Sequence, residues 1–209
     1  MGQRNQQGRR PMGIFCISTI FILGVISCSS VPHLKVDYRL PPSTEELKGQ
    51  KVVLSFSDVR RDKEILGKGA RDKFRDFSGK ILFSLSRGTE EGFMVGVYDL
   101  PLFIRELFKR RLENEGLGVL GPGETGDSEI QIALEEFKLD FMGGKWHFKM
   151  AYQARLKKEG KVLSRQMIRG RGERLRVIGT GDAHKIVGES LTDLVNQLDV
   201  GRLLRQAGM

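Results

Sequence analysis

The feature that most constrains the fold of this chain is a long run of alternating apolar and polar residues between positions 127 and 177. The parity of the apolar positions changes once, across Glu135-Glu136. Alternation with a period of two is typical of strands that bury one face, and a change of parity within a strand predicts a β-bulge. Gly143-Gly144 and Glu159-Gly160 favour tight turns. The run therefore predicts a meander of three consecutive antiparallel strands.

Two amphipathic helices are predicted on either side of the meander. The first spans Asp99–Glu115, where the aspartate can cap the helix, apolar residues recur every three or four positions, and Gly116 ends it. The second covers residues 180–198, and a further strand is predicted at Lys51–Asp58. The predicted fold class is α+β, a two-layer sandwich. Its antiparallel sheet, the three-strand meander plus the N-terminal strand, packs against two amphipathic helices.

Residues 65–97 are repeatedly interrupted by glycine, and only Ile81–Ser86 among them has the pattern of a strand. We expect an insertion or mobile loop here, a Gly-rich loop region inside a single α+β domain that covers residues 51–205. Gly67-Lys68-Gly69 lacks the full spacing of a phosphate-binding loop, so it is interpreted as a turn.

The N-terminal segment Ile14–Ile26 is uncharged and mostly apolar, and it follows three arginines with no acidic residue before it. This layout predicts a secretory signal peptide at residues 1–27, because a membrane span needs about 20 apolar residues. Val25–Cys28 resembles the lipobox of bacterial lipoproteins. The resemblance implies cleavage before Cys28, diacylglycerol on its thiol and acylation of the new amino terminus, such as with palmitate. The alternatives are an ordinary signal peptide or an anchor helix with an idle cysteine.

Residues 28–50 contain three prolines and are predicted to be the lipidated cysteine and a tether, with a short edge strand at Leu34–Tyr38. Cys16 and Cys28 are the only cysteines, so no disulfide framework is expected in the mature chain. Ser29 resembles the pattern of outer-membrane lipoproteins in Gram-negative cells. The expected location is the cell envelope, lipid-anchored at the outer membrane and facing the periplasm.

The charge of the chain favours anionic partners, with a formal net charge of +9. Strand alternation predicts that six basic residues of the meander share one face: Lys145, Lys149, Arg155, Lys157, Arg165 and Arg169. Such a patch suits an anionic lipid, lipopolysaccharide or an envelope protein complex, beside the membrane contact of the N-terminal lipid. The alternative is a solvated sheet face on which lysine and arginine prevent aggregation. Nucleic acid is not an expected partner of a secreted, anchored chain.

The sequence offers few candidates for catalysis or metal binding. His33, His147 and His184 have no metal-ligand spacing, and no Gly-x-Ser-x-Gly nucleophile motif occurs. Glu135-Glu136 are adjacent on a strand and are expected to point to opposite faces, unless the bulge brings both to one side. The turn Asp58–Arg61 predicts a structural ion pair. We therefore expect no catalytic residue, metal or cofactor.

The order of elements resembles the YajG-like family of uncharacterised bacterial lipoproteins. The resemblance rests on the lipobox, the first strand ending at Ser57–Arg60, the helix Asp99–Glu115, the strand opening at Asp127 and the long hairpin before the last helix. It implies a cell-envelope lipoprotein and brings no catalytic residues. We expect a lipid-anchored, non-enzymatic binding or assembly factor. The alternatives are an auxiliary lipoprotein subunit of an envelope lipid or polysaccharide transport system and, with least support, an envelope hydrolase.

Overall fold

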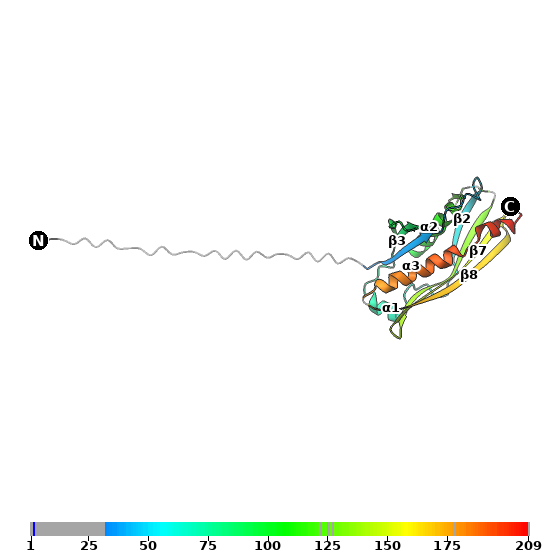
Figure 1. Cartoon of the computed structure of the whole chain (residues 1–209). Helices are drawn as coiled ribbons and strands as arrows, with labels where there is room; N and C mark the ends of the chain where they lie inside the picture. Colours follow the sequence, from blue (N-terminus) through cyan, green and yellow to red (C-terminus); the bar gives the residue numbers. More distant parts are fainter. Residues whose placement is uncertain are drawn as a thin grey trace. The chain divides into compact units, whose positions relative to one another are not determined.

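The computed structural model describes residue 2 and residues 32–208, apart from positions 122, 125, 127 and 178. The predicted signal peptide, except for Gly2, lies outside the described residues, and so do Cys28 and the first part of the predicted tether. The elements in chain order are β1 (Leu34–Leu40), β2 (Lys51–Asp58), α1 (Lys68–Lys73), β3 (Ile81–Arg87), β4 (Phe93–Tyr98), α2 (Leu100–Glu113), β5 (Gly118–Leu120), β6 (Glu129–Met142), β7 (Lys145–Lys158), β8 (Lys161–Leu175), α3 (Gly181–Asn196) and α4 (Val200–Arg205) (Figure 1).

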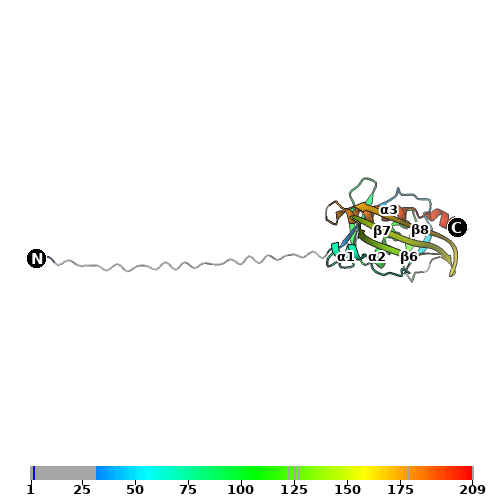
Figure 2. The same ribbon diagram turned by 90° about the horizontal axis from the view of Figure 1, so that it is seen from below.

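The larger sheet has the strand order β5-β2-β6-β7-β8, and its last three strands are the predicted antiparallel meander (Figure 2). The predicted bulge is confirmed, because the register between β6 and β7 shifts between Leu134 and Glu136. Gly143 and Gly144 have φ angles of 56° and 77°, the left-handed conformation that a two-residue hairpin turn needs at both positions.

The expectation of a purely antiparallel sheet is wrong for β2, which pairs in parallel with both β5 and β6. The cause is the long path between β2 and β6, which runs through α1, two strands of a second sheet, α2 and β5. A crossover of this kind returns the chain to the end from which it started, and parallel pairing requires such a return.

A second sheet with the order β1-β3-β4 was not predicted. β1 pairs in parallel with β3, and its alternate residues Leu34, Val36, Tyr38 and Leu40 are buried in the core. The short edge strand predicted at Leu34–Tyr38 is confirmed, since β1 lies at the edge of this sheet, but its buried side makes residues 34–40 part of the folded domain and not of a tether. The expectation of a loop at 65–97 is also wrong, because this region supplies α1, β3 and β4, although the strand expected at Ile81–Ser86 is confirmed.

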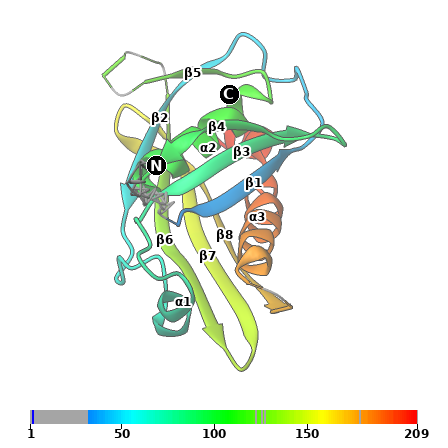
Figure 3. The same cartoon turned by 90° about the vertical axis from the view of Figure 1, so that its left-hand side faces the viewer.

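Both predicted amphipathic helices are present, and the α+β class is confirmed. The Asp99 carboxylate accepts a hydrogen bond from the Leu102 N–H at 3.1 Å and caps α2. α2 lies between the sheets (Figure 3), where Phe103 packs edge-on against Phe83 of β3 and Phe137 of β6, with ring centroids 5.3 and 6.5 Å apart. α3 lies along β1 and also contacts β7 and β8.

Among the described residues, no helix is long and apolar enough to cross a membrane.

Candidate functional site

The site is built on the side of the larger sheet that faces away from the core, which we call the outer face. On β7, Trp146, Phe148 and Tyr152 are fully buried against the helices and the smaller sheet. Because successive residues of a strand point to opposite sides, the odd-numbered residues of β7 lie on the outer face. Their partners across β8 are also odd-numbered between positions 165 and 175.

The six basic residues of the predicted patch all lie on the outer face, at Lys145, Lys149, Arg155, Lys157, Arg165 and Arg169. Two of them have acidic neighbours: the Lys157 ammonium lies 3.8 Å from Glu129, and the Lys145 ammonium lies 3.9 Å from Glu173. Arg155 donates a hydrogen bond to the Gln153 side chain. Lys149, Arg165 and Arg169 form no ion pair within the part of the chain that the structure describes.

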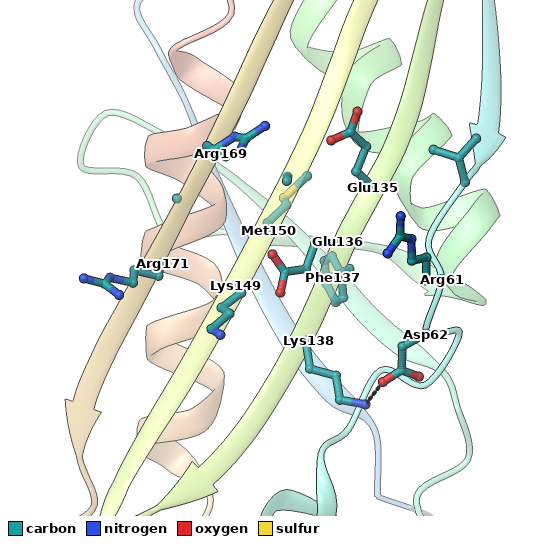
Figure 4. A pocket seen from close by; sticks show the side chains of 13 residues that line it. Arg61, Asp62, Glu135, Glu136, Phe137, Lys138, Lys149, Met150, Arg169 and Arg171 are labelled. Carbon is teal, nitrogen blue, oxygen red and sulfur yellow. Dashed lines mark hydrogen bonds and ion pairs between the residues drawn. The ribbon is translucent and has the colours of Figure 1, made fainter.

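A groove of about 860 Å³ lies on the outer face beside the bulge (Figure 4). We call it the outer-face groove. Its lining includes two residues of the predicted patch and three further cations, which together are Arg61, Lys138, Lys149, Arg169 and Arg171. Arg171 continues the alternation of β8, so the sequence carried a signal for it. Arg61 comes from the loop after β2, and no local pattern places it here.

The two adjacent glutamates, Glu135 and Glu136, both line this groove (Figure 4). The sequence predicted opposite faces unless the bulge brought both residues to one side, and the bulge does so, because it inserts one extra residue and leaves both carboxylates on the outer face. Among the described residues, neither glutamate forms an ion pair with a cation. The groove therefore holds two carboxylates and four cations, Arg61, Lys149, Arg169 and Arg171, that form no ion pair among the described residues.

The turn after β2 holds the groove wall in place through a partly buried ion pair. Arg60 is buried, and its guanidinium donates to both carboxylate oxygens of Asp58 at 3.0 Å. Burial raises the pKa of the Asp58 carboxyl, but hydrogen bonds from Arg60 and Lys63 outweigh this effect and leave the pKa below its usual range. The Asp58–Arg60 pair is structural, as predicted, and it positions Arg61 and Asp62 at the edge of the groove.

Asp62 is the acidic residue of the groove that does have a partner, since its carboxylate lies 2.7 Å from the Lys138 ammonium (Figure 4). The hydrogen bond from Lys138 lowers the pKa of the Asp62 carboxyl. This pair ties the loop after β2 to strand β6, so it leaves Lys138 with less capacity for a ligand than the other groove cations.

The three histidines have structural surroundings. The His33 ring is hydrogen-bonded to the Ser78 hydroxyl at 3.0 Å, and the His147 ring lies 3.4 Å from Glu173. His184 is half-buried, and its Nδ1 accepts a hydrogen bond from the Lys35 N–H at 3.1 Å. Burial, with a smaller contribution from the nearby Lys35 charge, lowers the pKa of His184 to about 4. This ring is therefore neutral and can accept that bond.

No group of three or more histidine, cysteine, aspartate or glutamate residues that could hold a metal ion occurs among the described residues. The Gly67-Lys68-Gly69 segment, interpreted as a turn, opens the short helix α1 instead. The Asp140 carboxylate accepts the Ala70 N–H at 3.2 Å, and a Cβ atom on Gly67 would lie 2.1 Å from the Asp140 Cγ. A carboxylate of the protein itself therefore occupies the place where a phosphate would have to lie.

No protein-family model matches this sequence, and the search of curated proteins finds no significant match. Among solved structures, XCC0632 from Xanthomonas campestris, described under DUF330, is similar with a TM-score of 0.55 and 13% identity, over 86% of this chain and 97% of that one. Lipoprotein GNA1162 from Neisseria meningitidis is similar with a TM-score of 0.37 and 9% identity, over 71% of this chain and 99% of that one. CT253 from Chlamydia trachomatis is similar with a TM-score of 0.41 and 11% identity, over 75% of this chain and 98% of that one.

The likeness to XCC0632 shows that the two chains share a fold and, at this identity, nothing more. The resemblance to the YajG-like family of lipoproteins stays a prediction.

Proposed function

We propose that this chain is a lipid-anchored protein of the cell envelope, held by Cys28 at the outer membrane on the periplasmic side. It acts as a non-enzymatic binding or assembly factor, and the outer face of its larger sheet binds an anionic partner. Candidate partners are the phosphate groups of anionic lipids or lipopolysaccharide and an acidic surface of an envelope protein complex.

The observation that carries the proposal is the way like charges stand opposite each other on the outer face. Arg155 is in register with Arg165, and Lys149 stands between Lys138 and Arg171. Like charges directly opposite across neighbouring strands destabilise a sheet. A face that only needed to stay soluble would gain from alternating signs, whereas an anion bound between these cations turns the repulsion into affinity.

The outer face can be tested on the full chain in a non-ionic detergent, titrated with mixed micelles that contain phosphatidylglycerol or, for comparison, phosphatidylcholine. The test variant replaces the six patch residues with glutamine. Because each cation near an anionic surface contributes about 1 kcal/mol, we expect binding of the phosphatidylglycerol micelles to weaken by roughly tenfold or more. The control variant replaces six exposed cations elsewhere, namely Arg75, Lys80, Arg87, Lys185, Arg202 and Arg205. Equal losses in both variants would contradict the proposal.

The anchor is tested separately in cells with a clickable fatty acid. The wild-type chain should become labelled and fractionate with the outer membrane, and Cys28→Ala should abolish the labelling. Cys16→Ala is the matched control and should leave labelling intact. Labelling that persists in Cys28→Ala would rule out the proposed anchor.

A second candidate function is an auxiliary lipoprotein subunit of an envelope transport system for lipid or polysaccharide. The observation that favours it is β4, an edge strand of the smaller sheet on which Phe93 and Met94 are 59% and 66% exposed. Exposed apolar side chains on an open strand edge are typical of protein contacts. A photo-crosslinking residue in place of Met94 should capture a partner protein in cells, and recovery of only the free monomer would argue against this function.

A further inference from the structure

The two glutamates and the two arginines of the outer-face groove come from different strands, Glu135 and Glu136 from β6 and Arg169 and Arg171 from β8. Glu136, Ala151 and Arg169 are in register across β6, β7 and β8, so the carboxylate stands on one side of the small alanine and the guanidinium on the other. Lys149 and Arg171 extend the cationic side along the next row (Figure 4). We call the Glu135–Glu136 side the acidic wall and the Lys149, Arg169 and Arg171 side the basic wall. The two other lining cations lie on the side of the acidic wall, where Lys138 is paired with Asp62 and Arg61 comes from the loop after β2.

No ion pair joins the two walls among the residues that the structure describes. Neighbouring strands are spaced by about 4.8 Å, so the backbones of Glu136 and Arg169, two strands apart, are separated by about 10 Å. Between them Ala151 contributes only a methyl group, which is 7% exposed. The ion pair recorded in the groove is Lys138–Asp62, at its edge. A small ligand thus fits between an unpaired carboxylate pair and an unpaired guanidinium pair.

The chemistry of the walls selects the ligand. Guanidinium groups match phosphate oxygens in shape and charge, and a primary ammonium offers three N–H donors to carboxylates. A ligand with a phosphate alone would leave Glu135 and Glu136 facing its negative charge. A quaternary ammonium is held by aromatic faces, but Phe137, the aromatic residue of the lining, is 1% exposed and turned into the core.

We propose that the outer-face groove binds a phosphodiester joined through a two-carbon chain to a primary ammonium, which is the chemistry of a phosphoethanolamine headgroup. Lys149, Arg169 and Arg171 bind the phosphate, and Glu135 and Glu136 bind the ammonium. The inference rests on the proposed function, because Lys149 and Arg169 belong to the predicted anionic-partner patch. The headgroup can come from a membrane lipid or from a soluble phosphodiester, and the chemistry is shared by both.

The test is calorimetric titration of the full chain in non-ionic detergent with glycerophosphoethanolamine, glycerophosphocholine and glycerophosphoglycerol. We expect the ethanolamine compound to bind about tenfold more tightly than either of the others, because only it satisfies both walls. Mixed micelles that contain phosphatidylethanolamine form a second arm. Binding of the soluble compound without binding of the micelles identifies a free phosphodiester as the ligand, and binding of both identifies a lipid headgroup.

Three variants assign the roles. Glu135→Gln with Glu136→Gln should remove the preference for ethanolamine and leave the three affinities similar. Glu173→Gln is the control, since it removes one carboxylate from the same face outside the groove. Ala151→Leu fills the space between the walls without changing a charge, and it should weaken glycerophosphoethanolamine binding by about tenfold or more.

Equal affinities for the ethanolamine and glycerol compounds, unchanged by the glutamate variants, would overturn the inference. So would the failure of all three headgroups to bind while phosphatidylglycerol micelles still prefer the wild-type chain over the six-residue glutamine variant. In both cases the proposed function survives. If the micelles show no such preference either, the proposed function fails as well.

Discussion

Two groups of charged side chains in this fold differ in what surrounds them. Arg111 is 4% exposed, forms an ion pair with Glu115, and donates to the Leu198 carbonyl, two residues beyond α3, at 3.2 Å. In the outer-face groove, Arg169 and Arg171 are exposed and, among the described residues, have no acidic partner. The fold supplies partners to the tip of the Arg111 side chain, although its buried Nε has no hydrogen-bond partner, and it leaves the groove arginines open.

The difference follows from the cost of burying a charge. An ionised group without partners inside a protein costs several kcal/mol, so a buried arginine is retained only where carboxylates and carbonyls surround it. An exposed arginine costs the fold little and gains little from ion pairs. Stability therefore explains Arg111 but does not explain the arginines of the groove. We call this the division between charges that stabilise the fold and charges that are left for a ligand. The variants that follow test it, from the largest expected effect to the smallest.

The largest effect is expected for Arg111→Met. The substitution keeps much of the side-chain volume but leaves Glu115 and the Leu198 carbonyl without their donor. We expect the free energy of unfolding to fall by about 3 kcal/mol. Urea unfolding followed by fluorescence measures this, because Trp146 is the single tryptophan and is fully buried.

The matched control is Arg110→Met, the adjacent arginine of α2. The Arg110 side chain is 40% exposed and pairs with Glu106 at the helix surface. Its loss should cost less than about 1 kcal/mol. If both variants lose the same stability, burial does not distinguish the two arginines and the division fails.

A medium effect with a defined pH dependence is expected for Asp58→Asn. The ordinary pKa of this carboxyl is 3.8. In the folded state burial raises the pKa, but Arg60 and Lys63 together lower it by more, so that the net pKa is depressed. A depressed pKa stabilises the fold above pH 3.8, and this contribution is lost as the pH falls through the folded-state pKa. The variant should be less stable than wild type by about 1 kcal/mol at neutral pH.

The difference in unfolding free energy between wild type and Asp58→Asn, called the gap below, should disappear in more acidic solution, because the wild-type carboxyl then becomes neutral as well. Asp62→Asn is the comparison, since the pKa of Asp62 is also lowered but the side chain is largely exposed. Its gap should be smaller at every pH. A gap for Asp58→Asn that does not depend on pH would show that the ion pair with Arg60 contributes nothing to stability.

How much of the fold could be predicted depends on whether a structural feature is specified by neighbouring residues or by residues far apart in the chain. The meander has a local signal at every step, because alternation, the parity change at Glu135-Glu136 and the turn at Gly143-Gly144 all lie within a few residues of the structure they specify. In the smaller sheet local patterns predicted the strands at residues 34–38 and 81–86, but not their pairing with each other or the strand β4. Leu34 pairs with Ile81 in parallel, and no turn connects the two strands. The glycines that suggested a loop lie partly in its turns, where Gly79 and Gly88 have positive φ angles.

The candidate site was predictable to the same degree. Alternation placed all six patch residues on one face, because that inference needs only the strand period. The groove needed two facts beyond the period. One is that the bulge brings Glu135 and Glu136 to the same side, and the other is that parallel pairing of β2 with β6 carries Arg61 to the groove. Sequence could suggest the first fact and had no signal for the second.

The smallest effect is expected for Lys149→Gln, and its sign is the sharpest test of the division. Lys149 stands in register between Lys138 and Arg171, so its charge meets a like charge on both neighbouring strands. Removing it should raise the free energy of unfolding by about 0.5 kcal/mol, because cross-strand repulsion is relieved. The gain should shrink in high salt, which screens exposed charges.

Urea unfolding at two salt concentrations measures both effects. Lys158→Gln, at the end of β7 opposite Lys161 and outside the groove, controls for repulsion alone. A loss of stability in Lys149→Gln would mean that the groove cations hold the sheet together, and they would then belong with Arg111.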